Sequence, residues 1–233
     1  MMVEANLSQA LGHFVSHSPW NSRRLMEAVR RRPASRHQDA DAVWVVHDGA
    51  FAKKGTHSVG VYRQLDRSVG RKLNCQIGVF VVQIGPAGYF PLAARLYLPG
   101  AWIQENPDLA ERTIPEDCRM PQSKAEIAVA LLDQLRADGE RPRPVVAEEG
   151  FHASNNFIDV LNQRGFVVAN DEIALIRARA GLDWMRAELG LDHFEGRNWL
   201  GWHHHVSLVF AAYYLLAAQA DRPEQPPFPD TKS

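Results

Sequence analysis

Acidic residues follow two apolar runs of the sequence, and their placement could support metal-ion chemistry. Asp48 comes directly after residues 42–47, and Glu148 and Glu149 come directly after residues 144–147. Each run is typical of a buried strand, and two such strands lying side by side would bring their carboxylates together. Converging carboxylates can hold a pair of Mg²⁺ or Mn²⁺ ions that promote phosphodiester cleavage. The alternative is that these are ordinary acidic residues in solvated loops.

The segments that must position these carboxylates alternate between strand and helix patterns. We expect helices at about 7–15 and from Ser18 onward, strands at 42–47, 76–84 and 89–98, a helix from Ser123 to Gly139, a strand at 144–147, a helix at about 154–163, a strand at 166–169, and helices at about 172–189 and 202–218. This order predicts an α/β fold of the RNase H-like kind. Its mixed sheet should contain about five strands flanked by helices, with a short N-terminal helical segment.

Length and composition indicate one ordinary globular domain. The chain has 233 residues, of which 45% are hydrophobic and 23% charged, which suits a core plus a small helical appendage. We expect an N-terminal helical segment and linker at 1–38, a core at 39–220, and a disordered tail at 221–233. No secretory signal or confident bilayer-spanning run is recognisable, so we expect a cytoplasmic protein without a membrane partner.

Basic residues form two local groups, although the formal net charge is −1. Any affinity for DNA must therefore come from local patches. The clearer group contains Lys53, Lys54, Arg63, Arg67, Arg71 and Lys72. It could neutralise backbone phosphates, with a solvated loop as the alternative. The other group contains Arg23, Arg24, Arg30, Arg31 and Arg32, and a solvated helix face is the favoured interpretation over a DNA contact.

The cysteines, the histidines and the glycines do not form the patterns typical of disulfide, metal-binding or nucleotide-binding sites. Cys75 and Cys118 are far apart and lie outside any CxxC spacing, which predicts neither a disulfide framework nor a cysteine-based zinc site. His203, His204 and His205 are consecutive on a predicted helix and point in different directions, so packing and capping contacts are favoured over a shared metal. The sequence has no phosphate-binding glycine loop or nucleophile elbow.

Several segments carry a resemblance to a known family. Residues 47–62, 74–79 and 95–99 are similar to segments of one branch of the DDE-type insertion-sequence transposases, which read approximately DDTGFPKKGKHSVGVARQY, NCQVAV and RLYLP. Residues 147–152 and 188–205 resemble the later family segments ADAAYG and ELGLDHFEGRSWRGWHHH. The resemblance runs in the family's order from about residue 42 to the final helix. It implies an RNase H-like core and metal-dependent DNA strand cleavage and transfer.

The resemblance also implies three acidic ligands, which this chain keeps only in part. Asp48 stands at the first position, and Glu148 stands at the second, where one extra methylene adds roughly 1.5 Å of reach. Arg179 stands at the position of the family's glutamate, where a cation would repel a metal ion. Glu172 and Glu188 lie about two turns to either side on the same predicted helix. The family's insertion between the fifth strand and this helix is missing.

Two hypotheses follow from these residues. In the first, the protein is a transposase-like enzyme with catalytic residues Asp48, Glu148 and Glu188, with Glu172 as another candidate third ligand. Mg²⁺ or Mn²⁺ would be bound at Asp48 and Glu148, and Lys53, Lys54, Arg63, Arg71 and Lys72 would contact DNA. The resemblance makes transposon ends the expected DNA partner and allows a homodimer. In the second, the chain is a catalytically inactive transposase derivative that binds DNA or protein.

Overall fold

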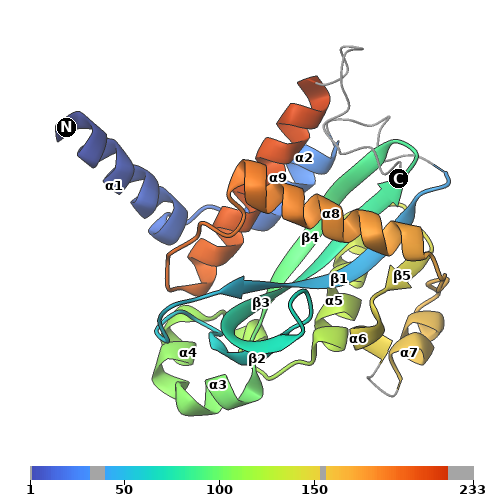
Figure 1. The fold of residues 1–233 in the computed structure, drawn as a ribbon, viewed down its shortest axis with the longest axis horizontal. Helices are drawn as coiled ribbons and strands as arrows, with labels where there is room; N and C mark the ends of the chain where they lie inside the picture. Colours follow the sequence, from blue (N-terminus) through green and yellow to red (C-terminus); the bar gives the residue numbers. More distant parts are fainter. Residues whose placement is uncertain (1, 32–39, 153–155, 220–233) are drawn as a thin grey trace.

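A five-stranded mixed sheet forms the centre of the molecule (Figure 1). The structure, a computed structural model, describes residues 2–31, 40–152 and 156–219. The first strand, β1 (Val43–Ala52), pairs antiparallel with β3 (Arg71–Gly85) and parallel with β5 (Val145–Ala147). The long strand β3 also pairs antiparallel with β2 (Tyr62–Asp66) near its start and with β4 (Gly88–Tyr97) along the rest.

The strand order confirms the predicted fold class. Cys75 of β3 pairs with Ala52 of β1 and with Tyr62 of β2, so β1 and β2 lie on opposite edges of β3. Since a strand has only two edges, β4 shares the edge of β2. The order β4, β3, β1, β5, with β5 parallel to β1, is that of an RNase H-like sheet. Most of β3 is buried without alternation, as expected for a strand covered on both faces.

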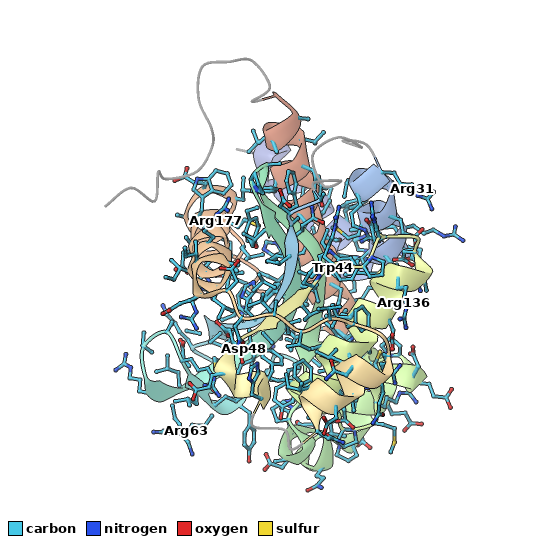
Figure 2. All side chains as sticks on the ribbon, turned by 90° about the vertical axis from the view of Figure 1, so that its right-hand side faces the viewer. Arg31, Trp44, Asp48, Arg63, Arg136 and Arg177 are labelled. Atoms are coloured by element: carbon cyan, nitrogen blue, oxygen red, sulfur yellow. The ribbon has the colours of Figure 1, made fainter. Side chains whose placement is uncertain are left out.

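Helices cover both faces of the sheet. On one face, α8 (Glu172–Leu189) and α9 (Trp199–Gln219) enclose a hydrophobic cluster with Phe80. On the other face, α5 (Lys124–Ala137) and α7 (Phe157–Gln163) enclose a second cluster that includes Trp44. Figure 2 shows this layering, with Arg177 of α8 and Arg136 of α5 on opposite sides of the sheet. The sheet therefore carries a core on each side.

Local sequence signals set the ends of the two helices that reach the candidate site. The Ser123 side chain accepts a hydrogen bond from the backbone of Glu126, whose carboxylate accepts one from Ser123 in return, so α5 begins with a capping box. The Asp171 side chain caps α8 by accepting a hydrogen bond of 2.9 Å from Ala174 N. Gly190 ends α8 in the left-handed region, at a φ of 65°. The expected span of α8 is confirmed.

Six further helical segments complete the described part of the chain. They are α1 (Met2–His17), α2 (Ser22–Arg31), α3 (Gly100–Glu105), α4 (Pro107–Thr113), a 3₁₀ turn (Glu116–Cys118) and α6 (Glu149–His152). The predicted start of the second helix at Ser18 is wrong, because α2 begins at Ser22, directly after Asn21, whose side chain accepts a hydrogen bond from Arg24 N. Among the helices described, none is both long and apolar enough to cross a membrane.

The structure corrects several other predicted elements, and some predicted segments lie outside the residues that it describes. The first strand does not end at Asp48, because its pairing with β3 continues to Ala52. Strand β2 was not predicted, and residues 166–169 contribute only a bridge between Val168 and Val145 instead of a full strand. The helix expected at 154–163 begins at Phe157, after undescribed residues 153–155. The linker at 33–39 and the tail at 221–233 lie outside the described residues.

Arg30 contradicts the interpretation of the N-terminal basic group as a solvated helix face. Its side chain is 1% exposed and donates to Asp138 Oδ2 and Glu140 Oε1, each at 2.8 Å. A third hydrogen bond of 2.9 Å reaches the backbone oxygen of Leu92 on β4. The guanidinium therefore joins α2 to the sheet and to the loop after α5.

Candidate functional site

The parallel pairing of β1 and β5 brings Asp48 and Glu148 together. Val46 lies opposite Ala147, and Glu148 N donates to Val46 O at 3.0 Å. Glu148 then turns its side chain back toward β1, where its Oε2 accepts a hydrogen bond of 3.3 Å from Asp48 N. Glu148 is 5% exposed. The expected convergence of these two carboxylates is present, although Asp48 lies within its strand and not at the tip.

Each of the two carboxylates forms an ion pair with a cation from a different layer of the fold. Lys124, the first residue of α5, places its Nζ on Asp48 Oδ2. Arg179, in the middle of α8, donates from Nε to Glu148 Oε1 at 2.7 Å. Sequence reasoning found Arg179 through the family motif and missed Lys124. The available signal for Lys124 was its place directly after the Ser123 cap, which fixes it at the start of a helix.

The β2–β3 hairpin closes one side of a pocket over these ion pairs. The pocket has a volume of about 340 Å³ and is lined by Asp48, Glu148 and Arg179, with Asp66, Arg67 and Ser68 of the hairpin and Asp183 and Arg186 of α8. The Arg67 guanidinium lies against Gly150, where a Cβ would be only 2.5 Å from Nη2. Figure 2 shows the hairpin, marked by Arg63, projecting beside Asp48. A larger residue at 150 would meet the Arg67 guanidinium, which is the flexible end of an exposed side chain.

The charges around this pocket balance one another. The carboxylates are Asp48, Asp66, Glu148 and Asp183, and the cations are Lys124, Arg67, Arg179 and Arg186. Asp66 accepts hydrogen bonds from Ser68 N and Oγ, at 2.9 and 2.6 Å. Arg186 donates to Asp183 Oδ1 and to the backbone oxygen of Ala50, both at 2.8 Å. Three of these carboxylates form ion pairs and the two signs are equal in number, so no large negative excess is left to attract a divalent cation.

Neither glutamate expected as the third acidic ligand lies at this site. Within the described residues, no group of three or more His, Cys, Asp or Glu side chains is arranged to hold a metal ion. Glu172 and Glu188 are exposed on α8, seven residues before and nine residues after Arg179. At about 1.5 Å of rise per residue, they lie roughly 10 Å and 13 Å from it along the helix. Neither lines the pocket, and Glu149 does not line it either.

A fully buried histidine lies beside the carboxylates on the other face of β1. His47 stacks on Phe80, with 5.5 Å between the ring centroids, and neither of its ring nitrogens has a hydrogen-bond partner among the described residues. Burial lowers the pKa of His47, with the Glu148 and Asp48 charges acting in the opposite direction. A neutral imidazole at this position adds no positive charge to the network.

The predicted DNA-contacting residues lie on the β2–β3 hairpin and on the loop after β1, which is hydrogen-bonded to Asn74 of β3. Arg63, Arg71 and Lys72 are exposed on the β2–β3 hairpin, where the register puts Arg63 and Lys72 on one face and Arg71 on the other. Lys54 is exposed on the loop after β1. Lys53 is half-buried, and its Nζ donates to Phe194 O. Burial lowers the pKa of Lys53, so it is less suited to a phosphate contact than its neighbours.

The three consecutive histidines of α9 make separate backbone contacts, as the sequence indicated. His203 Nδ1 lies 2.9 Å from Trp199 O. His204 lies 2.9 Å from Val15 O through Nδ1 and 2.8 Å from Trp20 O through Nε2. His205 Nε2 lies 3.0 Å from Gly190 O. These histidines therefore hold loops and helix ends through separate backbone contacts.

Protonation of His203 is expected to destabilise the fold as the pH falls. Burial lowers the pKa of His203 to about 4, so between about pH 6.5 and 4 the unfolded chain binds a proton that the folded chain does not. This difference should lower the free energy of unfolding by about 2 kcal/mol between pH 7 and 5, and by less if water reaches the partly exposed ring. Urea unfolding at both pH values would measure it.

The control for this prediction is His203→Gln, which keeps a donor and an acceptor but does not titrate. The variant should lose stability less steeply than the parent over this range. Burial also lowers the pKa values of His47 and His205, so some pH dependence should remain. An unchanged slope in the variant would exclude His203 as a contributor.

Three comparisons with known proteins bear on this site. The family model described as "DDE superfamily endonuclease" matches residues 2–170. A search of curated proteins finds no match. Among solved structures, the chain is similar to one in the crystal structure of a pre-cleavage Mos1 transpososome, with 11% identity and a TM-score of 0.23. That similarity covers 90% of this chain and 66% of the other, slightly less than two thirds of its length.

Proposed function

The chain belongs to the DDE superfamily endonucleases, and from this premise we propose that it is a transposase-like DNA-binding protein that no longer cuts DNA. One observation carries the proposal. Both carboxylates at the candidate site are neutralised by the protein itself, Asp48 by Lys124 and Glu148 by Arg179. Because lysine and arginine already neutralise these carboxylates, a divalent metal ion would gain little electrostatic attraction there.

The residues present do not fit the metal ions that this superfamily implies. DDE superfamily endonucleases generally depend on divalent metal, and carboxylate oxygens favour Mg²⁺ or Mn²⁺. Here Asp48 and Glu148 are the two ligands that the family resemblance implies, and binding an ion between them would require both existing ion pairs to break. The guanidinium of Arg179 would also repel the ion, since it lies 2.7 Å from a prospective ligand oxygen. We therefore assign no cleavage step to this site.

The β2–β3 hairpin is the part of the molecule best suited to bind DNA. Arg63, Arg71 and Lys72 are exposed on it and form no ion pair among the described residues, and Arg67 extends the positive charge to its tip. Phosphate contacts of this kind would position DNA without reading its sequence. By family resemblance the DNA would include transposon ends. The hairpin would hold the DNA beside the pocket of paired charges.

DNA binding is expected to weaken when the hairpin loses charge. Fluorescence anisotropy with a labelled duplex of about 30 base pairs would measure affinity at about 50 mM and 200 mM salt. The double variant Arg63→Gln/Lys72→Gln should bind about tenfold more weakly at the lower salt concentration and show a shallower salt dependence, by about 0.9 per lost phosphate contact. The matched control is Arg24→Gln/Arg141→Gln, which removes the same charge from exposed positions outside the hairpin.

Two results would count against the proposed function. Equal loss of affinity in the two double variants would mean that DNA responds to total charge and not to the hairpin. Incubation of the unmodified chain with Mn²⁺ and transposon-end DNA should give no strand breaks. Cleavage that disappears in Asp48→Ala would show an active site and overturn the assignment of a non-cutting protein.

A further inference from the structure

A second pocket, larger than the first, lies along the free edge of β4. This edge pocket has a volume of about 540 Å³ and is lined by residues of β4, α2, α5 and α9. It shares no lining residue with the pocket at Asp48. Its apolar walls include Met26, Leu92, Leu131, Trp199, Val206 and Phe210. The volume falls within the usual range for small-molecule sites.

Apart from His203, the acidic and basic residues that line the edge pocket are all arginines. Arg23, Arg30 and Arg95 line it, and no Asp or Glu is among its lining residues. Arg30 uses its three nitrogens on Asp138, Glu140 and Leu92 O, as described above. Arg23 is also paired, with Asp138 and Glu27. Both of these arginines are therefore satisfied by the protein.

Arg95 differs from the other two arginines because it lacks a counter-charge. It is only partly exposed, and within the described residues it makes no hydrogen bond and no ion pair. Its positive charge acts on two other residues that line the pocket, Cys118 and His203. Burial raises the pKa of the Cys118 thiol, and Arg95 opposes that rise. Burial lowers the pKa of His203, and Arg95 adds to that effect. A partly desolvated guanidinium with five donors is thus available inside the pocket.

We propose that the edge pocket binds a small amphipathic carboxylate, with its carboxylate on Arg95 and its apolar body against Leu131 and Phe210. A carboxylate would supply the counter-charge that Arg95 lacks, and its two oxygens match the fork of the guanidinium. An aromatic or aliphatic body of modest size would cover the apolar walls. Gln134 and Asn21 also line the pocket and can hydrogen-bond to polar parts of the ligand. This ligand site does not depend on the proposed DNA binding.

The two cysteines of the chain provide a direct readout of the pocket. Cys118 lines it and is partly exposed, whereas Cys75 is 0% exposed. A thiol reagent should therefore react first with Cys118 in the folded protein. A ligand seated in the edge pocket should slow that reaction, and the rate constant gives a measurement independent of calorimetry.

The test compares naphthoate with its uncharged analogue naphthalenemethanol on the full chain. Naphthoate should bind by calorimetry, slow the Cys118 reaction, and bind at least about tenfold more tightly than the alcohol because of the charged hydrogen bonds to Arg95. Arg95→Gln should remove most of this preference. Gln134→Glu, nearly identical in shape, places a carboxylate on the wall and should weaken naphthoate but not the alcohol.

Control variants and the binding results together decide whether the edge pocket binds a carboxylate. If Arg95→Gln fails to fold, as judged by circular dichroism, the Gln134→Glu result decides the question. Arg141→Gln, at an exposed position outside the pocket, should leave naphthoate binding unchanged. The proposal is overturned if the unmodified chain does not bind naphthoate. It is equally overturned if acid and alcohol bind alike, or if binding leaves the Cys118 rate unchanged.

Discussion

Arg179→Glu is expected to create a Mn²⁺ site, whereas the described residues of the unmodified protein contain no group of three or more side chains arranged to hold a metal ion. The substitution removes the cation that lies 2.7 Å from Glu148 Oε1 and directs a third carboxylate toward Glu148 and Asp48. Three carboxylates with a few waters resemble the oxygen ligand sets that bind hard divalent ions. We expect a change from no detectable binding to a Kd of about 0.1 to 1 mM, measured by calorimetry, as for the weaker oxygen-ligand sites in proteins.

The thermal stability of Arg179→Glu should depend on the metal in a way that the parent does not. Without metal, the variant faces like charges at a nearly buried Glu148 and should lose about 1 kcal/mol, a modest value because the Arg179 side chain is 60% exposed. For a chain of this size, that change lowers Tm by about 3 °C. Mn²⁺ at 100 times its Kd should restore about 2.7 kcal/mol.

The control that isolates the added ligand is Arg179→Gln, which removes the cation without adding a carboxylate. It should lose stability like Arg179→Glu but gain little from Mn²⁺. If Arg179→Gln binds Mn²⁺ as well as Arg179→Glu, then the arginine blocks an intact two-carboxylate site. If the unmodified chain binds Mn²⁺ tightly, the interpretation of Lys124 and Arg179 as replacements for metal is wrong.

Arg30→Met is expected to be the most destabilising of the substitutions considered. The side chain is 1% exposed and faces Asp138, which is 2% exposed, and Glu140, which is 17% exposed. Removing the guanidinium leaves buried carboxylates with one remaining cation, Arg23, which is itself 50% exposed. Breaking a buried pair in this way destabilises by about 3 to 5 kcal/mol, which urea unfolding would show as a lower midpoint with an unchanged slope.

Two further variants separate the buried ion cluster from ordinary charge loss. The triple variant Arg30→Met/Asp138→Asn/Glu140→Gln removes the unpaired charges and should recover most of the lost stability. Arg164→Met breaks the pair with Asp133, in which the two side chains are 46% and 27% exposed, and should change stability by less than about 1 kcal/mol. Equal effects of Arg30→Met and Arg164→Met would contradict the account of α2 as anchored by a buried guanidinium.

The elements predicted correctly from sequence are those with local signals. Helix α8 was expected at its observed span, and in the structure Asp171 caps its start and Gly190 its end. The hairpin of β3 and β4 was expected because two long apolar runs flank a short turn. The alternation of strands and helices predicted that the strands carrying Asp48 and preceding Glu148 can be neighbours. Parallel neighbouring strands have their carboxyl ends at the same edge of the sheet, so the two side chains meet there.

The features missed from sequence depend on contacts between distant residues. Strand β2 is short and polar, with Arg63 and Gln64 at its centre, and it is a strand because β3 extends far enough to pair with it. The pairing of Lys124 with Asp48 joins residues 76 positions apart. Arg30 looked like one member of a solvated basic helix, and only the fold brings it to carboxylates 108 and 110 residues away. No local pattern encodes these partners.

The contacts of His204 have a consequence for the order in which the molecule assembles. They join α9 to backbone oxygens of Val15 and Trp20, 189 and 184 residues earlier, and Asn198 donates to Ser16 O across 182 residues. During synthesis at about 5 to 20 residues per second, α1 and α2 therefore emerge roughly ten seconds or more before their docking surface exists. Loops of this length close slowly. The N-terminal helices should accordingly be the last part of the described structure to dock and the first to become accessible to proteases.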